Sequence, residues 1–352
     1  MTPDVDRRGQ GLRERLELGT VICAEGYVFE LERRGYLQAG PYVPEVVLDH
    51  PEQVKALHEQ FVHAGSDVVE ALTYYAHREK LRTVGKDGLL EALNRHALEL
   101  AREVSADTGT LFAGNVCNTN LYDPSDTTTH VLVRAMFEEQ VGWAAEAGVD
   151  FVIGETFRYG EEALLALDVI REAGLSAVIT LAVGREPETR EGWALPDACM
   201  RLASEGADVV GLNCIRGPST MLPLLAGITA AVDVPVAALP VPYRTHADQP
   251  TFQSLNESDT SLLPDGRAFP TALDPFTCNR YEIAAFAREA HALGVRYLGL
   301  CCGAAPHHVR SMAEALGRTP PAGRYSPDMS KHAFLGGDPV LASHNRAYAE
   351  HL

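Results

Sequence analysis

The chain of 352 residues lacks any apolar run close to the roughly 20 residues that a membrane-spanning helix needs. It also lacks an excess of basic residues, because 48 acidic residues outnumber 30 lysines and arginines and leave a formal net charge of −18. This balance argues against nucleic acid or an anionic membrane as the main partner. The first 19 residues are polar throughout, so we expect no secretory signal.

A disulfide framework and a dinucleotide loop are also missing. Seven cysteines, an odd number, are spread over the whole chain, which is not the spacing of a disulfide-stabilised domain. We therefore expect a cytoplasmic protein whose free thiols can serve as metal ligands. The stretch AEGYVFELERRG, after the first apolar run, contains no G-x-G-x-x-G pattern. This argues against a doubly wound open sheet.

What the chain does contain is a regular alternation of short apolar runs with longer amphipathic segments. Near-continuous apolar runs are typical of parallel strands that are buried on both faces. Several amphipathic segments, such as 51–65 and 280–294, end in a glycine that can form a left-handed helix cap before the next run. Eight such units favour a single (β/α)8 barrel, also called a TIM barrel. The runs predicted as strands are 20–25, 67–75, 110–117, 149–156, 176–183, 208–214, 234–241 and 295–302.

Two segments interrupt this alternation. Residues 243–276 are rich in Pro, Ser, Thr and Asp, and they predict a long loop after the seventh strand, on the catalytic face of the barrel. The segment 319–352 lies beyond the eight units. We therefore expect a barrel over residues 11–318 and a C-terminal extension over 319–352, which could contact a neighbouring subunit.

Three cysteines stand at the carboxyl ends of predicted strands, where (β/α)8 barrels carry their reactive groups. Cys214 ends the sixth strand, and Cys301 and Cys302 end the eighth, so the three thiols can converge at the barrel mouth. Three thiolates that leave a fourth position open describe a catalytic zinc site. The alternative interpretation is that these cysteines are small hydrophobic core residues, as buried cysteines often are.

The segments around these cysteines resemble a known family. GLNC at 211–214 and GLCCG at 299–303 are similar to the zinc motifs of the homocysteine S-methyltransferase family. The longer segments 29–76 and 287–310 resemble the betaine–homocysteine methyltransferases in particular, and the likeness extends from about residue 11 to residue 318. The resemblance implies a (β/α)8 barrel that binds Zn²⁺ through the three cysteines.

The activity that the resemblance implies is a zinc-dependent methyl transfer. A thiol bound to zinc is deprotonated, and the thiolate is the nucleophilic form. The zinc-bound thiolate of homocysteine would take a methyl group from glycine betaine or a related methylated ammonium, giving methionine and the demethylated amine. Two alternatives stay open. One is a sulfonium donor of the S-methylmethionine or dimethylsulfoniopropionate type, and the other is a non-catalytic zinc-thiolate barrel that binds or senses.

The same resemblance implies the residues that bind the acceptor. Glu155, at the end of the fourth strand, would hold the homocysteine ammonium and count with the cysteines as catalytic. Where the family has an aspartate after the first strand, this chain has Ala24, and Glu25 is displaced by one position. Because such a shift on a strand points to the other face, Glu25 could replace the aspartate only if the chain is already turning. Gly26 would allow the backbone to approach the amino acid.

A methylated cation is held by the faces of aromatic rings. Tyr75 matches the cage tyrosine of the betaine enzymes, and Tyr42 stands where they carry tryptophan. Thr156 stands where they carry an aromatic residue after the fourth-strand glutamate. We count these three residues as substrate-binding, with Tyr74 as a further candidate, but the changes leave the identity of the donor open.

Other polar residues near the strand ends receive smaller roles. Cys23 and Cys117 could line the pocket, whereas His307 and His308, at the start of the last helix, are expected to be solvated. The betaine enzymes associate through segments beyond the barrel, so the resemblance also implies a homo-oligomer.

Overall fold

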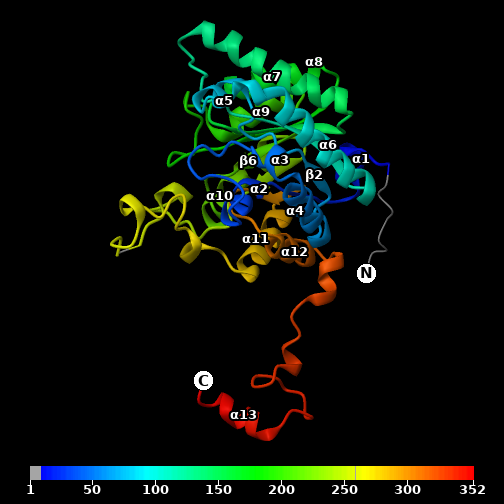
Figure 1. The fold of residues 1–352 in the computed structure, drawn as a ribbon, viewed down its shortest axis with the longest axis vertical. Coiled ribbons are helices and arrows are strands. Elements are labelled where there is room, and N and C mark those ends of the chain that lie inside the picture. Colours follow the sequence, from blue (N-terminus) through cyan, green and yellow to red (C-terminus); the bar gives the residue numbers. More distant parts are fainter. Residues whose placement is uncertain (1–8, 258) are drawn as a thin grey trace.

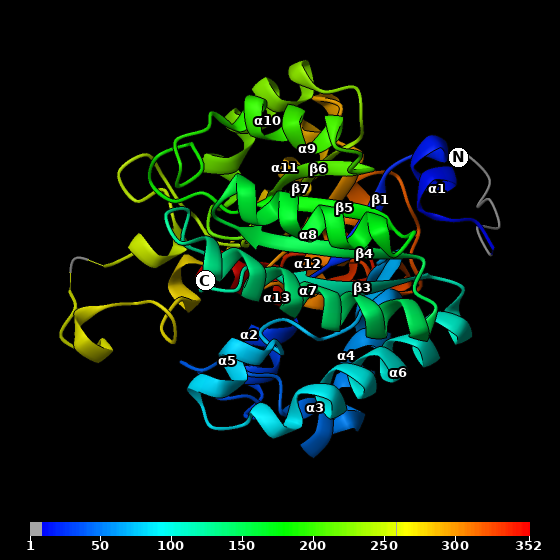
Figure 2. The same cartoon turned by 90° about the horizontal axis from the view of Figure 1, so that it is seen from above.

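A computed structural model describes residues 9–257 and 259–352, so the first part of the polar N-terminal stretch lies outside the described residues. The eight predicted strands form and close into one parallel barrel in chain order (Figures 1 and 2). The barrel closes where Val21 pairs with Tyr297 and Ala24 with Leu300. The strands are β1 (Val21–Ala24), β2 (Val68–Glu70), β3 (Leu111–Cys117), β4 (Phe151–Phe157), β5 (Ser176–Leu181), β6 (Val209–Asn213), β7 (Val236–Leu239) and β8 (Tyr297–Leu300).

Helices surround the barrel, as Figure 2 shows. Gly65 and Gly148 follow two of these helices with φ of 115° and 77°, which is the predicted left-handed cap. Each cap returns the chain to the barrel within a few residues. The helices are α1 (Leu12–Leu18), α2 (Tyr27–Arg33), α3 (Val46–Asp49), α4 (Pro51–Ala64), α5 (Arg78–Thr83), α6 (Leu90–Thr108), α7 (Thr127–Ala147), α8 (Gly160–Glu172), α9 (Leu195–Ser204), α10 (Pro218–Ala231), α11 (Arg280–Ala292), α12 (Pro306–Ala315) and α13 (Ser343–Ala349), with a short 3₁₀ turn, η1 (Asp87–Leu89), before α6.

The buried apolar residues form two clusters, one inside the barrel and one between strands and helices. The inner cluster contains Phe151 together with Leu12 and Leu16 of α1, which pack against the interior residues of the strands. Successive side chains of a strand point to opposite faces. Accordingly, Cys23 belongs to the inner cluster and Ala24 to the outer one. This alternation decides which side chains at the strand ends point into the barrel mouth.

The connection between β7 and α11 is long and contains no α-helix among its described residues. Residue 258 of this connection lies outside the described part of the chain. The backbone amide of Phe252 donates to the carbonyl of Ile215 at 2.8 Å, which ties the connection to the loop after β6. Its regular elements are the 3₁₀ turns η2 (Phe252–Ser254), η3 (Pro264–Gly266) and η4 (Asp274–Phe276).

The chain continues beyond α12 as an extension. It passes through two 3₁₀ turns, η5 (Pro321–Tyr325) and η6 (Met329–Lys331), before it reaches α13. Figure 1 shows this extension leaving the barrel, with α13 and the C-terminus at a distance from it. Among the described residues, no helix combines the length and the apolar character needed to cross a membrane.

Candidate active site

Three thiols meet at the carboxyl end of the barrel. Cys214 directly follows β6, and Cys301 and Cys302 directly follow β8. Their sulfur atoms lie within 4.8 Å of one another, and the Sγ atoms of Cys301 and Cys302 are 3.9 Å apart. In a tetrahedral zinc site with Zn–S bonds of about 2.3 Å, neighbouring sulfurs are roughly 3.8 Å apart. The pair Cys301 and Cys302 has this spacing, and Cys214 lies close enough to join them around one metal ion.

The three thiols differ in acidity although they are close together. Hydrogen bonds from Cys301 and Cys302 lower the pKa of Cys214 well below its ordinary value. The same contacts with Cys214 raise the pKa of both neighbours well above theirs. Cys214 is therefore the most acidic of the three thiols. A divalent cation bound here would displace the protons of its thiol ligands.

The backbone around this cluster is strained. Cys214 and Ile215 have φ of 53° and 55°, and Tyr75 and Thr156 each have φ of 58°. A residue other than glycine in this left-handed region stores roughly 1–3 kcal/mol. In β4 the register with β5 shifts between Gly154 and Phe157, which is a bulge around Thr156. Bulges of this kind re-aim side chains near active sites.

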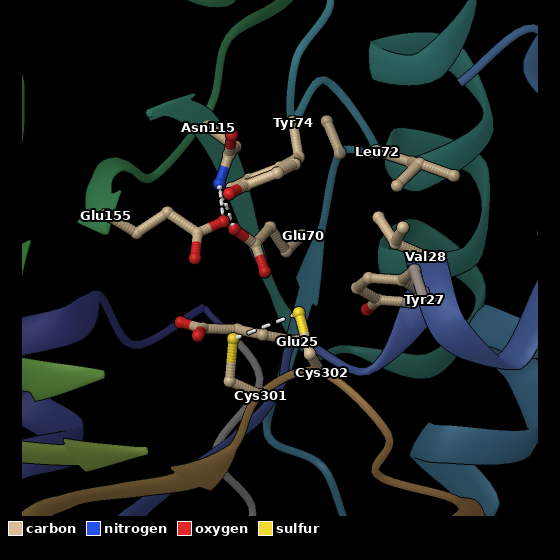
Figure 3. Close-up of a pocket in the computed structure, with 11 residues that line it drawn as sticks. Glu25, Tyr27, Val28, Glu70, Leu72, Tyr74, Asn115, Glu155, Cys301 and Cys302 are labelled. Atoms are coloured by element: carbon tan, nitrogen blue, oxygen red, sulfur yellow. Dashed lines mark hydrogen bonds between the residues drawn. The ribbon is translucent and has the colours of Figure 1, made fainter. Parts of the chain in front are cut away.

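Three glutamates face the space beside the thiols (Figure 3). Glu25, Glu70 and Glu155 line one cavity, and between 2% and 6% of each residue is exposed. In each case the residue two places earlier belongs to the inner cluster, so strand alternation points all three inward. The Glu25 amide still donates to the Leu300 carbonyl at 3.0 Å. Glu25 lies just beyond the end of β1, where the chain passes into α2, and its side chain lines the cavity at the barrel mouth.

Two asparagines connect these carboxylates. Asn115 Nδ2 donates to Glu70 Oε1 at 2.5 Å and to Glu155 Oε1 at 2.7 Å. Asn213 Nδ2 donates to Glu155 Oε2 at 2.7 Å and to Glu25 Oε2 at 3.4 Å. Both oxygens of Glu155 are thus engaged. Glu25 Oε1 and Glu70 Oε2 have no hydrogen-bond partner among the described residues.

The carboxylates sit in an environment that favours their neutral form. Burial raises the pKa of all three, and that of Glu155 reaches about 8. Repulsion from Glu155 adds to this effect at Glu25 and Glu70. Neither lysine nor arginine is among the described residues that line the cavity. A cationic group on a ligand would allow these acids to ionise.

The cavity is small, with a volume of about 20 Å³, which is room for roughly one water molecule. Carboxylates, Asn115 and the side chains of Cys301 and Cys302 form its polar side. Its remaining wall is mostly apolar and consists of Tyr27, Val28, Ala71, Leu72 and Tyr74.

Among the predicted donor contacts, Tyr74 lines this cavity, whereas Tyr42, Tyr75 and Thr156 do not. Tyr75 packs beside Tyr74 with ring centroids 4.3 Å apart, and Lys80 Nζ already lies 4.5 Å from the Tyr75 ring centroid. Tyr42 is half-buried and stacks on Phe29 with 11° between the ring planes. The predicted strand 67–75 was too long, because β2 ends at Glu70 and the two tyrosines belong to the following loop.

Two further predicted residues have local structural partners. The Thr156 hydroxyl accepts from Asn118 Nδ2 at 2.8 Å and donates to the Glu155 carbonyl at 2.7 Å. At Gly26, a side chain would place its Cβ only 2.4 Å from the carbonyl oxygen of Ala304. Gly26 therefore lets the loop after β1 touch the loop that carries Cys301 and Cys302.

With this geometry described, the chain can be compared with known proteins. The sequence model of homocysteine S-methyltransferases matches residues 21–316, the whole barrel. The chain belongs to the homocysteine S-methyltransferase family. It is 37% identical over 338 residues to betaine–homocysteine S-methyltransferase 1 of Xenopus tropicalis, which covers 93% of this chain and 80% of that protein. Its identity to the S-methylmethionine–homocysteine S-methyltransferase of Mus musculus is 34% over 341 residues, with 94% and 87% covered.

A solved structure supports the fold. The metallated form of the homocysteine methyltransferase MmuM from Escherichia coli superimposes with a TM-score of 0.66 at 20% identity, covering 86% of this chain and 99% of that one. Membership of the family confirms the predicted resemblance and supports a methyltransferase that acts on homocysteine. The two relatives from frog and mouse are named for different methyl donors.

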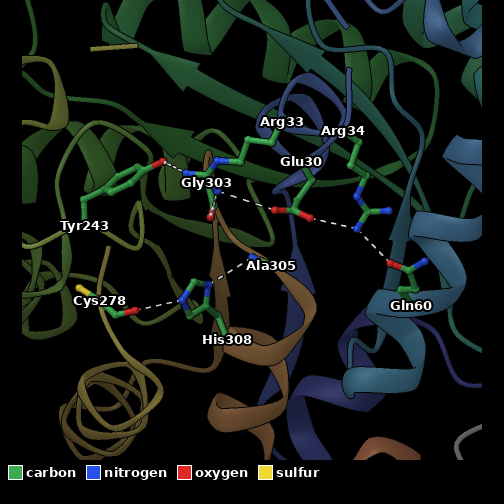
Figure 4. A network of polar contacts seen from close by, with 9 residues as sticks. All are labelled: Glu30, Arg33, Arg34, Gln60, Tyr243, Cys278, Gly303, Ala305 and His308. Atoms are coloured by element: carbon green, nitrogen blue, oxygen red, sulfur yellow. Dashed lines mark hydrogen bonds and ion pairs between the residues drawn. The ribbon is translucent and has the colours of Figure 1, made fainter. Parts of the chain in front are cut away.

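In this family member, an arginine holds the cysteine loop from behind (Figure 4). Arg33 of α2 donates to the Gly303 carbonyl at 3.2 Å and to the Tyr243 hydroxyl at 2.8 Å. Gly303 has φ of 93°, and a Cβ there would lie 2.2 Å from the same hydroxyl. The loop that follows Cys302 is therefore packed too tightly to accept a side chain at this point.

The adjoining histidines behave differently from each other. His307 is exposed, as predicted, but the expectation that His308 is solvated is wrong because only 1% of it is exposed. His308 Nε2 donates to the Cys278 carbonyl at 3.0 Å, and its Nδ1 accepts from the Ala305 amide at 3.2 Å (Figure 4). Burial lowers the pKa of His308 to about 3. It is a neutral cap that joins the start of α12 to the preceding loop.

The sequence analysis missed Glu70, Asn115 and Asn213. A signal for them was present, because each occupies an inward-facing position at the carboxyl end of its strand. Taking every second residue along each strand, starting from an inward-facing core residue, would have identified these three positions. The two cysteines left open do not line the cavity: Cys23 lies within 4.8 Å of Glu25 and Glu70, and Cys117 Sγ accepts a backbone amide at 3.3 Å.

Proposed function

We propose that this chain is a zinc-dependent homocysteine S-methyltransferase of the betaine type. It would move a methyl group from glycine betaine, or a related methylated ammonium, to the sulfur of homocysteine, giving methionine and the demethylated amine. The observation that carries the proposal is a cluster of three thiols, two of which line a cavity together with three buried carboxylates. The thiols suit a metal that activates a thiol, and the carboxylates suit the ammonium of an amino acid.

The residues that would hold zinc are Cys214, Cys301 and Cys302. Their spacing fits a tetrahedral ion, and three protein ligands leave the fourth position for the substrate sulfur. Bound zinc would supply deprotonation of that thiol, so that the sulfur is nucleophilic at neutral pH. Glu155 would hold the substrate ammonium, with Glu25 as a second carboxylate in place of the family's aspartate.

The site would also align the substrate sulfur with the donor methyl group and exclude water from them. The substrate sulfur forms a bond to the methyl carbon while the bond from that carbon to the donor nitrogen breaks. The electron pair of the broken bond stays on nitrogen, so the leaving group is a neutral amine and needs no acid. Holding sulfur and methyl about 3–3.5 Å apart supplies much of the rate gain. Gly26 would contribute by bringing the acceptor loop against the cysteine loop.

The donor would bind where aromatic faces adjoin the thiols, with Tyr42, Tyr75 and Thr156 as proposed contacts. Tyr74, which lines the cavity, joins them. A sulfonium donor, as in S-methylmethionine or dimethylsulfoniopropionate, is the second candidate. One observation favours it: the mouse relative is named for S-methylmethionine.

The first experiment measures methionine formed from homocysteine by zinc-loaded protein with each donor in turn. We expect turnover with glycine betaine, and faster turnover with a sulfonium would select the second candidate. Cys214→Ala, Cys301→Ala and Cys302→Ala should each lower zinc content and abolish turnover. Cys199→Ala, at a buried cysteine of α9 outside the cavity, is the matched control. Zinc bound without turnover with any donor would instead indicate a binding or sensing barrel.

We also propose that residues 11–318 form the catalytic domain and that 319–352 join two or more copies of the chain. The extension carries large apolar side chains in solvent, including Val340 and Leu352, which are 85% and 75% exposed. Light scattering should give an oligomer for the full chain and a smaller species after truncation at residue 318. A monomeric full chain would contradict this proposal.

The seven cysteines are free thiols, which suits the cytoplasmic location that we propose.

A further inference from the structure

We propose that Lys80 determines donor specificity: its ammonium lies on the Tyr75 ring until a zwitterionic donor takes that ring, and it then pairs with the donor's carboxylate. The inference rests on the proposed function, because it takes Tyr75 as part of the donor site. It goes further by naming a residue outside the aromatic contacts. It also predicts which methylated cations the site rejects, namely those that carry no anionic group.

The Tyr75 ring already has two close neighbours. The Tyr74 ring lies 4.3 Å away between centroids, and Lys80 Nζ lies 4.5 Å from the Tyr75 ring centroid. The Tyr75 hydroxyl accepts from Asn120 Nδ2 at 3.2 Å, and the Tyr75 amide donates to Cys117 Sγ at 3.3 Å, so the residue is held at both ends. A cation bound to an aromatic ring lies within about 6 Å of its centroid. A donor cation on this ring would therefore displace one of the two neighbours.

Lys80 reaches the ring from the first turn of α5. Its backbone amide donates to Nδ1 of His77, the residue that caps α5, at 3.3 Å. The His77 ring in turn lies edge-on to Tyr75, with centroids 6.0 Å apart. The backbone of Lys80 is thus fixed beside Tyr75, whereas its ammonium is a point charge on a flexible four-carbon stem. Of the two neighbours of the Tyr75 ring, Lys80 is therefore the one that a donor can displace.

The Lys80 ammonium has no anionic partner. Among the described residues, no carboxylate lies within ion-pair distance of it, and the adjacent Glu79 accepts from Arg82 at 2.7 and 2.8 Å. Lys55 and Lys86, by contrast, each pair with a glutamate. Lys80 is half-buried, and burial lowers its pKa below the ordinary value. A partly desolvated cation without a counter-ion attracts a carboxylate more strongly than a fully solvated one does.

The chemistry of the donor completes the argument. In glycine betaine a single CH₂ group separates the quaternary nitrogen from the carboxylate. When the methylated nitrogen takes the ring, its carboxylate lies beside the ammonium that it has displaced, and a charge-assisted hydrogen bond can form. Tetramethylammonium has no carboxylate, so it would displace Lys80 without supplying an acceptor for it. The exchange therefore favours donors that carry an anionic group close to the methylated centre.

The test compares glycine betaine with tetramethylammonium in methionine formation by zinc-loaded protein at saturating homocysteine. The measured quantities are KM for glycine betaine and the inhibition constant Ki of tetramethylammonium against it. Lys80→Met keeps the length of the side chain and removes its charge. We expect Ki/KM to fall roughly 10-fold, because KM rises with the loss of the ion pair and Ki falls with the loss of the competing cation. The value of kcat should change by less than about twofold, since binding alone is affected.

Two further variants make the test specific. Lys80→Arg keeps the charge and should retain most of the wild-type ratio. Lys55→Met is the matched control, because Lys55 lies on α4 and pairs with Glu103, and it should leave KM and Ki unchanged. If the protein uses a sulfonium instead, dimethylsulfonioacetate and trimethylsulfonium replace the two ammonium compounds, because they differ by the same anionic group.

Two results would overturn the inference and leave the proposed function intact. An unchanged Ki/KM in Lys80→Met would mean that Lys80 has no part in donor choice. A lower Ki with an unaltered KM would show that Lys80 only competes with cations and does not bind the carboxylate. A wild-type protein that makes no methionine from either class of donor would end the proposed function, and the inference with it.

Discussion

Replacing His58 with phenylalanine should make the protein less sensitive to acid. His58 lies on α4 behind the cavity, is 0% exposed and packs edge-on against Tyr27 with ring centroids 4.8 Å apart. Neither of its ring nitrogens has a hydrogen-bond partner in the described part of the chain. Burial lowers the pKa of this histidine from 6.5 to about 3, and no charged neighbour contributes to the shift.

The sign and size of the effect follow from proton linkage. The unfolded chain binds a proton at this histidine near pH 6.5, whereas the folded protein does so only near pH 3. Acid therefore favours the unfolded state: the stabilisation is complete above pH 6.5 and is lost as the pH falls toward 3. The loss is about 1.4 kcal/mol for each pH unit, or about 2.7 kcal/mol between pH 6.5 and 4.5. Phenylalanine cannot be protonated, so it removes this pH-dependent loss of stability. It also removes two buried ring nitrogens that have no hydrogen-bond partner.

The assay is urea unfolding at several pH values from 8 to 4.5, with a chelator present so that zinc release does not contribute. We expect the free energy of unfolding of His58→Phe to equal or exceed that of wild type at pH 8, and the gap to widen as the pH falls. His63→Gln, at an exposed histidine on the same helix, is the control. Parallel curves for wild type and His58→Phe would refute the reasoning.

Three further predictions concern the loops of the site. Gly26→Ala should reduce kcat/KM at least tenfold, because its Cβ would lie 2.4 Å from the Ala304 oxygen and separate the two loops. Arg33→Lys should lower zinc affinity roughly 10- to 100-fold in competition with a chelator, since lysine cannot reproduce the fork that holds the Gly303 loop. Asn213→Ala should lower the free energy of unfolding by about 1–3 kcal/mol in urea, because it removes a donor from a buried carboxylate.

Each of these has a result that would contradict it. Normal kinetics for Gly26→Ala would mean that the loops can shift without harm to the site. Unaltered zinc affinity in Arg33→Lys would show that the cysteine loop does not depend on the arginine. A fully stable Asn213→Ala would indicate that water replaces the lost donor.

The sequence by itself determined the barrel and the places of its thiols. Apolar runs and glycine caps are local patterns, since a strand alternates by two residues and a helix ends at its own cap. Each predicted strand overlaps an observed one, and Gly65 and Gly148 form the predicted caps. Cys214, Cys301 and Cys302 could be placed at one mouth because parallel strands of a barrel all end on the same side.

Only the tertiary structure decided which polar side chains meet. Glu70, Asn115 and Asn213 belong to three different strands and Glu25 follows a fourth, and their hydrogen bonds join residues up to 188 positions apart. The strained loop after β2 turned Tyr74 rather than Tyr75 into the cavity, and burial against α11 made His308 neutral. The physical reason is that the barrel closes through the pairing of β1 with β8. This closure fixes distances between residues far apart in the chain, and no local sequence pattern encodes those distances.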